Sequence, residues 1–147
     1  MKFNAKSFSE LSTTELYEII KSRTEIFLLE QKIICQDLDD VDYKSFHCFF
    51  QDKGRVIGYL RAFLDEADEN TVIIGRVLTL EHGKGIGTLL MEKSIKKIKE
   101  RFLCKKISLH AQKQAVPFYE KLGFFVVSDE FLEEGVVHLT MEKEFFE

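Results

Sequence analysis

Residues 71–88, TVIIGRVLTLEHGKGIGT, decide the fold class because they join a β-rich segment to a helical one through a glycine-rich turn. Residues 71–80 are rich in β-branched and aliphatic side chains, which predicts a strand that is buried on both faces. Over residues 86–102, apolar side chains recur every three or four positions and lysines fall between them, which predicts an amphipathic helix. A strand followed at once by a helix is typical of an α/β protein.

The segments before this stretch predict one helix and one β-hairpin. Ser12 with Glu15 three residues later forms a capping-box pattern, so we expect a helix to begin there. Residues 36–44 are polar and acidic, which indicates an irregular connection. The β-rich runs 46–50 and 55–64 are separated by Asp52-Lys53-Gly54, which is typical of a hairpin turn.

The segments after this stretch complete the pattern. Residues 106–110 predict a short strand, and residues 114–122 predict a two-turn helix that carries Pro117 in its first turn. Two further β-rich runs, 124–132 and 136–143, predict a second hairpin. The order of elements predicts an α/β fold with a mixed sheet, and we expect the whole chain, 1–147, to form a single domain.

Composition narrows the classes of function. The chain has 147 residues and a net charge of −4, which disfavours nucleic-acid binding through a basic surface. No apolar run approaches the roughly 18 residues of a membrane span, and the first residues do not form a signal peptide, so we expect a cytoplasmic protein without a membrane partner. Three widely spaced cysteines indicate neither a disulfide framework nor a zinc site.

The turn HGKGIGT, residues 82–88, has the chemistry of an anion site. Glycines let backbone N–H groups approach an anion, and the start of a helix adds unpaired donors and partial positive charge. Lys84 adds a full charge. The turn fits neither the Walker pattern, because Gly85 follows Lys84, nor the dinucleotide pattern, because Thr88 replaces its third glycine. The glycines alone fit a plain tight turn equally well.

A resemblance favours the anion site. The stretch around His82-x-x-Gly85-x-Gly87 resembles motif A of the GNAT superfamily of N-acetyltransferases, and AVPFYEKLGFF, residues 115–125, is similar to its motif B. Further matches place the chain near the ElaA-like branch of that family. These lie at Arg23, Phe27, Glu30, Gln31, Asp37, Asp39, Asp42, His47, Ala111, Gln112 and residues 133–141. Two features depart from the pattern, because His82 replaces a glutamine or arginine and the loop before Gly83 is about two residues short.

The resemblance implies a mostly antiparallel sheet with one splayed parallel pair of strands, here 71–80 and 106–110, and acetyl-CoA held between them. It implies that the backbone N–H of Leu78 polarises the thioester carbonyl and that Tyr119 protonates the departing CoA thiolate. It also implies the residues that bind acetyl-CoA: Leu78, Thr79, His82, Gly83, Lys84, Gly85, Ile86, Gly87, Thr88 and Phe118. No metal is expected, because the histidines lack ligand spacing.

We therefore expect an N-acetyltransferase that moves an acetyl group directly from acetyl-CoA to a primary amine of a small molecule or peptide. The alternatives are a non-catalytic domain that binds or senses CoA and, third, a structural or protein-interaction domain.

Three points stay open in the sequence. His110, His138, Glu81 or a water molecule are the alternatives for the general base, and the oligomeric state is open, with a homodimer as the candidate. The acidic residues Asp37, Asp39, Asp40 and Asp42 are expected to be solvated charge that could steer a cationic amine.

Overall fold

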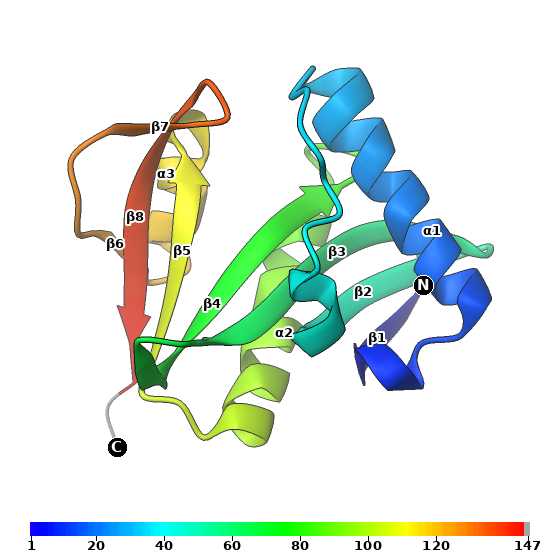
Figure 1. Cartoon of the computed structure of the whole chain (residues 1–147), viewed down its shortest axis with the longest axis horizontal. Helices are drawn as coiled ribbons and strands as arrows, with labels where there is room; N and C mark the ends of the chain where they lie inside the picture. Colours follow the sequence, from blue (N-terminus) through cyan, green and yellow to red (C-terminus); the bar gives the residue numbers. More distant parts are fainter. Residues whose placement is uncertain (146–147) are drawn as a thin grey trace.

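A mixed sheet forms the centre of the structure, a computed structural model that describes residues 1–145 (Figure 1). Its strands are β1 (Lys2–Ser7), β2 (Phe46–Asp52), β3 (Arg55–Asp65), β4 (Asp68–Thr79), β5 (Lys106–Gln112), β6 (Phe125–Val126), β7 (Phe131–Glu133) and β8 (Val136–Glu144). They lie in the order β1-β2-β3-β4-β5-β8-β6, and β7 also pairs with β8. All pairs are antiparallel except β4 with β5. The α/β class with a mixed sheet and one parallel pair is thus confirmed.

Helices cover both faces of the sheet. They are α1 (Thr13–Arg23), which continues into the π-helical η2 (Thr24–Glu30), α2 (Ile86–Phe102) and α3 (Val116–Lys121). Short 3-10 turns lie at η1 (Phe8–Glu10), η3 (Val41–Lys44) and η4 (Lys113–Ala115). In Figure 1, α1 lies in front of the sheet, and α2 and α3 lie behind it. Among residues 1–145, no helix has both the length and the apolar character that a membrane crossing needs.

The N-terminal helix begins where the capping box predicts. The Ser12 hydroxyl accepts a hydrogen bond from the Glu15 N–H at 3.0 Å, and the Glu15 carboxylate accepts one from the Ser12 N–H at 2.8 Å. Through Ile19 and, in η2, Ile26, this helical segment packs on one face of the sheet against Phe49 and Tyr59. The reciprocal bonds satisfy two N–H groups that a helix start otherwise leaves unpaired.

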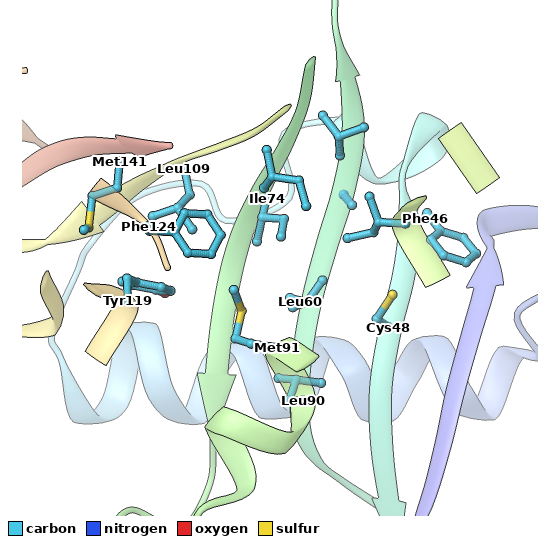
Figure 2. Packing of buried hydrophobic residues seen from close by; sticks show 14 of the residues in the cluster. Phe46, Cys48, Leu60, Ile74, Leu90, Met91, Leu109, Tyr119, Phe124 and Met141 are labelled. Atoms are coloured by element: carbon cyan, nitrogen blue, oxygen red, sulfur yellow. The ribbon is translucent and has the colours of Figure 1, made fainter. Parts of the chain in front are cut away.

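The larger core lies on the opposite face and runs under both β4 and β5. Leu90 and Met91 of α2 pack there with Ile74 of β4, while Leu109 of β5 packs in the same cluster with Tyr119 of α3 (Figure 2). Because one cluster joins the helices to both parallel strands, the relative position of these strands is fixed by packing.

Both hairpin turns are one residue shorter than predicted. β2 and β3 are joined by Lys53-Gly54, with φ of 51° and 80°, and β7 and β8 by Glu134-Gly135, with φ of 49° and 74°. Two residues with positive φ form the tight turn that suits the right-handed twist of paired strands. The acidic residues at the edges of the two turns, Asp52 and Glu133, are therefore strand residues.

Two predictions about strands are wrong. The run 124–132 is interrupted between β6 and β7, because the Ser128 hydroxyl accepts a hydrogen bond from the Thr140 N–H at 2.8 Å in place of a backbone carbonyl. Strand β4 is not buried on both faces, because Val72 and Ile74 are buried whereas Ile73 is half-exposed. The half-exposed face of β4 is the one on the α1 side of the sheet, where β4 is only partly covered.

Three of the four aspartates after η2 are not solvated charge, and the expectation is corrected for Asp37, Asp39 and Asp42. Asp39 receives two hydrogen bonds from the buried Arg61, at 2.7 and 2.8 Å. Asp42 is bound by the buried Arg23 at 2.7 Å, and Asp37 by Arg23 at 2.9 Å and by Arg76 at 2.8 Å. We call these three aspartates and three arginines the ion-pair network. It fastens the acidic segment to the sheet, because a buried guanidinium needs a charge partner.

The network predicts a loss of stability in acid. Hydrogen bonds from Arg61 lower the pKa of Asp39 from its ordinary value of 3.8 to about 2. A lowered pKa in the folded protein stabilises it above the ordinary value, and this contribution is lost as the pH falls from about 4 towards 2. In urea unfolding at pH 5 and pH 2.5, Asp39→Asn should be less stable than wild type at pH 5 and should lose less stability on acidification.

Asp40→Asn is the matched control, since Asp40 lies in the same segment with an exposed side chain. It should follow wild type at both pH values. An Asp39→Asn protein that loses as much stability as wild type would contradict the assignment.

Candidate active site between β4 and β5

The two parallel strands pair over only part of their length. Residues of β4 and β5 are paired from Thr71 with Lys106 to Ile74 with Leu109. Beyond this point the two strands no longer pair with each other, over residues 75–79 of β4 and 110–112 of β5, and their ribbons diverge in Figure 1. The expected splay of the strands therefore begins after Ile74 and Leu109, and it leaves backbone groups of β4 without a sheet partner on the β5 side.

A bulge in β4 lies where the strands part. The register against β3 shifts between Tyr59, which faces Leu78, and Arg61, which faces Gly75. Within the bulge Arg76 has φ of 55°, a left-handed conformation that costs a non-glycine residue about 1–2 kcal/mol. The Arg76 side chain donates to the carboxylate of Asp37 at 2.8 Å and to its carbonyl oxygen at 3.0 Å. These bonds hold the bulge against the acidic segment.

The register also sets the direction of the backbone donors beyond the bulge. The Leu80 N–H donates to the Ile57 carbonyl at 2.9 Å, and residues in an antiparallel pair alternate between facing the partner strand and facing away. Leu78, opposite Tyr59, therefore directs its N–H at β3, whereas Thr79 directs its backbone groups away from β3, to the open side. The Leu78 N–H is thus engaged inside the sheet.

The predicted anion turn forms the entry to α2. Gly83 and Gly85 have φ of 76° and 75°, and Gly85 is the N-cap of α2, which has no side-chain cap and no acidic residue in its first turn. The N–H groups of residues 86–88 therefore have no intrahelical acceptor. Lys84 extends from this turn and pairs with Glu81 at 2.9 Å. The arrangement suits an anionic ligand.

Phe118 of α3 approaches the same turn. A β-carbon at Gly87 would lie 3.3 Å from the Phe118 ring, so a larger residue at this position would displace the ring. Phe118 contacts the ring of Tyr119 edge-on, with centroids 5.0 Å apart. The structure thus brings together residues 82–88 and Phe118, which lie far apart in sequence.

Tyr119 is buried in the core and keeps its proton. Its ring also packs on Phe124, with centroids 5.9 Å apart, and 7% of the residue is exposed (Figure 2). Its hydroxyl forms no hydrogen bond with any group in residues 1–145. Burial raises the pKa of Tyr119 well above its usual value, so the hydroxyl stays neutral and can only donate its proton to a strongly basic partner or share it in a hydrogen bond.

The three candidate bases are not gathered in one place. Glu81 belongs to the turn beside Lys84, on the β4 side. His110 of β5 and His138 of β8 lie together with Glu133 of β7, 2.8 Å from Nδ1 of His110 and 3.6 Å from Nε2 of His138. The sequence indicates no role for Glu133, since only the pairing of β7 with β8 brings it to the histidines.

Two neighbouring residues at the end of η2 contact residues on both sides of the point where β4 and β5 part. These are Glu30 and Gln31. Glu30 accepts a hydrogen bond from Nε2 of His82 at 3.0 Å, and Gln31 accepts one from the side-chain amide of Gln112 at 2.9 Å. His82, predicted as a phosphate ligand, is therefore paired with a carboxylate. The resemblance includes Glu30, Gln31 and Gln112 without roles, and it was the one signal in the sequence that could have marked them.

Comparison with known proteins agrees with this geometry. A model of the Acetyltransferase (GNAT) domain matches residues 8–145. A UPF0039 protein of Schizosaccharomyces pombe is 34% identical over 148 residues, which cover 98% of this chain and 97% of that protein. Protein ElaA of Escherichia coli is 31% identical over 140 residues, 92% of each chain.

Solved structures extend the comparison. The crystal structure of Escherichia coli ElaA matches with a TM-score of 0.90 and 29% identity over 97% of this chain and 99% of that chain. The crystal structure of an acyl-CoA N-acyltransferase from Pseudomonas aeruginosa also matches with a TM-score of 0.90, at 30% identity and the same coverage.

The bulge is tested by two substitutions at one position. Arg76→Ala and Arg76→Gly both remove the bonds to Asp37, but only glycine relieves the left-handed backbone. We expect Arg76→Gly to unfold at higher urea concentration than Arg76→Ala, with a difference of about 1 kcal/mol. Equal stability of the two variants, or a more stable alanine variant, would show that residue 76 does not adopt this conformation.

Proposed function

Because this chain belongs to the GNAT family of acetyltransferases, we propose that it transfers the acetyl group of acetyl-CoA to the primary amine of a small molecule or peptide. The observation that carries the proposal is the parting of β4 and β5 between an anion-binding turn and Tyr119. This gap supplies unpaired backbone donors, and the turn beside it supplies donors for phosphates. A chain of this family that lacked both features would fit a role without catalysis better.

In this proposal the turn 82–88 binds the pyrophosphate of CoA through its backbone N–H groups, assisted by Lys84. The pantetheine arm lies along the open edge of β4, where Thr79 offers its backbone donor and acceptor. The resemblance implied that the N–H of Leu78 polarises the thioester carbonyl. Because Leu78 faces Tyr59 of β3, we assign this role to a backbone N–H on the open side of 75–79. Phe118 packs beside the turn and lines the far side of the gap.

The reaction needs two forms of assistance. The amine attacks the thioester carbonyl, and backbone N–H groups on the open side of 75–79 stabilise the negative charge that develops on its oxygen. The C–S bond then breaks, and the departing thiolate takes a proton from Tyr119. Thiolate is a basic partner, and the neutral hydroxyl of Tyr119 has no competing acceptor in residues 1–145.

We propose a primary amine as the acceptor, and its recognition requires no further positive charge. Steering of a cationic amine relied on free carboxylates at residues 37–42. In the ion-pair network three aspartates face three arginines, so little uncompensated charge is left to attract a cation. A screen of primary amines for release of CoA thiol would identify the acceptor, and it tests the proposal directly.

Gly85→Val should weaken acetyl-CoA binding at least 10-fold, because a branched side chain at the N-cap of α2 projects into the space assigned to the phosphates. Gly54→Val is the matched control. Both glycines have positive φ, 75° and 80°, and neither has an atom within 4 Å of the added β-carbon, but Gly54 lies in the β2–β3 turn. Calorimetric titration with acetyl-CoA should separate them, and equal binding by the two folded variants would rule out the turn as the phosphate site.

Tyr119→Phe should lower turnover on the order of 10- to 1,000-fold with acetyl-CoA and the best amine from the screen, because it removes only the proton donor. Stability should change by less than about 0.5 kcal/mol, since the hydroxyl has no partner in residues 1–145. Tyr43→Phe, at an exposed tyrosine, should behave as wild type. Unchanged turnover in a folded Tyr119→Phe protein would exclude Tyr119 as the acid.

A further inference from the structure

A histidine, a carboxylate and a second histidine lie in contact on the open face of β5, β7 and β8. Glu133 places one oxygen 2.8 Å from Nδ1 of His110 and the other 3.6 Å from Nε2 of His138. Phe131 lies between the two imidazoles, edge-on to His110 at 5.0 Å and stacked on His138 at 6.1 Å. Glu133 therefore contacts both imidazoles, and on β8 Glu142 lies diagonal to His110, where it is paired with Lys106 at 3.3 Å.

The contacts define which nitrogen of His110 is available. A carboxylate accepts a hydrogen bond, so Nδ1 of His110 carries the proton that faces Glu133. Nε2 then has a free lone pair, and half of the His110 side chain is exposed. A carboxylate in this position also stabilises the imidazolium that forms when Nε2 takes a proton, as it does when it orients a catalytic histidine elsewhere.

His110 stands at the point where the strands part. Leu109 is the last residue of β5 paired with β4, and His110 is the next. Side chains alternate along a strand, and Leu109 and Ala111 point into the core that contains Tyr119, so His110 points to the opposite face. Tyr119, the expected proton donor to sulfur, and Nε2 of His110 thus lie on opposite faces of the sheet, near the point where β4 and β5 part.

We propose that His110 is the general base that takes the proton of the attacking amine, with Glu133 as its positioning residue. The inference rests on the proposed function. An ammonium acceptor loses two protons in all. Nε2 of His110 accepts the first before attack and passes it to solvent, then accepts the second as the C–N bond forms. The C–S bond breaks, sulfur takes a proton from Tyr119, and solvent restores that proton. One proton is released for each acetyl group transferred.

The other two candidates fit this role less well. The His138 side chain is 9% exposed, and its Nδ1 donates to the carbonyl of Val136 at 2.8 Å, which leaves Nε2 directed at Glu133 rather than at solvent. Glu81 is paired with Lys84 on the turn assigned to the phosphates.

The test compares two acceptors in His110→Gln, Glu133→Gln and wild type. The first acceptor is the best primary alkylamine from the screen, which is protonated at pH 7, and the second is the hydrazide of the same skeleton, which is neutral. With the alkylamine, kcat/KM should fall about 100- to 10,000-fold in His110→Gln and about 10-fold in Glu133→Gln. With the hydrazide, which needs no deprotonation before attack, the loss in His110→Gln should shrink at least 10-fold. Acetyl-CoA affinity should not change.

Glu130→Gln is the matched control for Glu133→Gln, because Glu130 is also exposed and paired, with Lys113 at 2.6 Å, but lies outside the cluster. It should keep wild-type kinetics. Wild-type kcat/KM in folded His110→Gln, or an equal loss with both acceptors, would overturn the role of His110 and leave acetyl transfer in place. Should His110→Gln fail to fold, wild-type kinetics in Glu133→Gln would overturn the dyad. A wild-type protein that binds acetyl-CoA but releases no thiol with any amine would overturn both proposals.

Discussion

The left-handed backbone of Arg76 is the constraint on which the rest of the site depends. An α-carbon with a side chain adopts this conformation only at a cost, and here the cost is offset by the bonds from the Arg76 guanidinium to Asp37. The extra residue shifts the register against β3 and changes the course of β4 where its pairing with β5 ends. The bulge therefore marks the point beyond which β4 and β5 no longer pair.

The ion-pair network gives the acidic segment a structural role. Arg23 and Arg61 are almost completely buried, and each is held by two aspartates. Pairs of this kind contribute little net stability relative to apolar packing, but removing one partner is costly because it leaves a buried charge alone. The network is therefore best understood as fixing one position of residues 37–42 against the bulge and the sheet.

The sequence predicts well whatever depends on local pattern. The capping box at Ser12, the helix over 86–102 and the glycine turn are confirmed because propensity, spacing and caps are properties of neighbouring residues. What depends on distant pairing was predicted less well. Nothing near Asp37 and Asp39 in the sequence pairs their charges, because the arginines come from β3 and β4. The direction of the Leu78 N–H follows from a bulge that the sequence does not mark. The roles given to the turn and to Tyr119 stay predictions.

The single hydrophobic cluster beneath β4 and β5 has a consequence for the energetics of the site. Ile74 and Leu109, the last paired residues, share this cluster with Tyr119 and with Met91 of α2. Strands β4 and β5 cannot move apart without breaking densely packed apolar contacts. The entropy of fixing the spacing of β4 and β5 is therefore lost when the chain folds, and no later event has to order these two strands. A cavity created in this cluster would therefore loosen the relative position of β4 and β5 as well as lower stability.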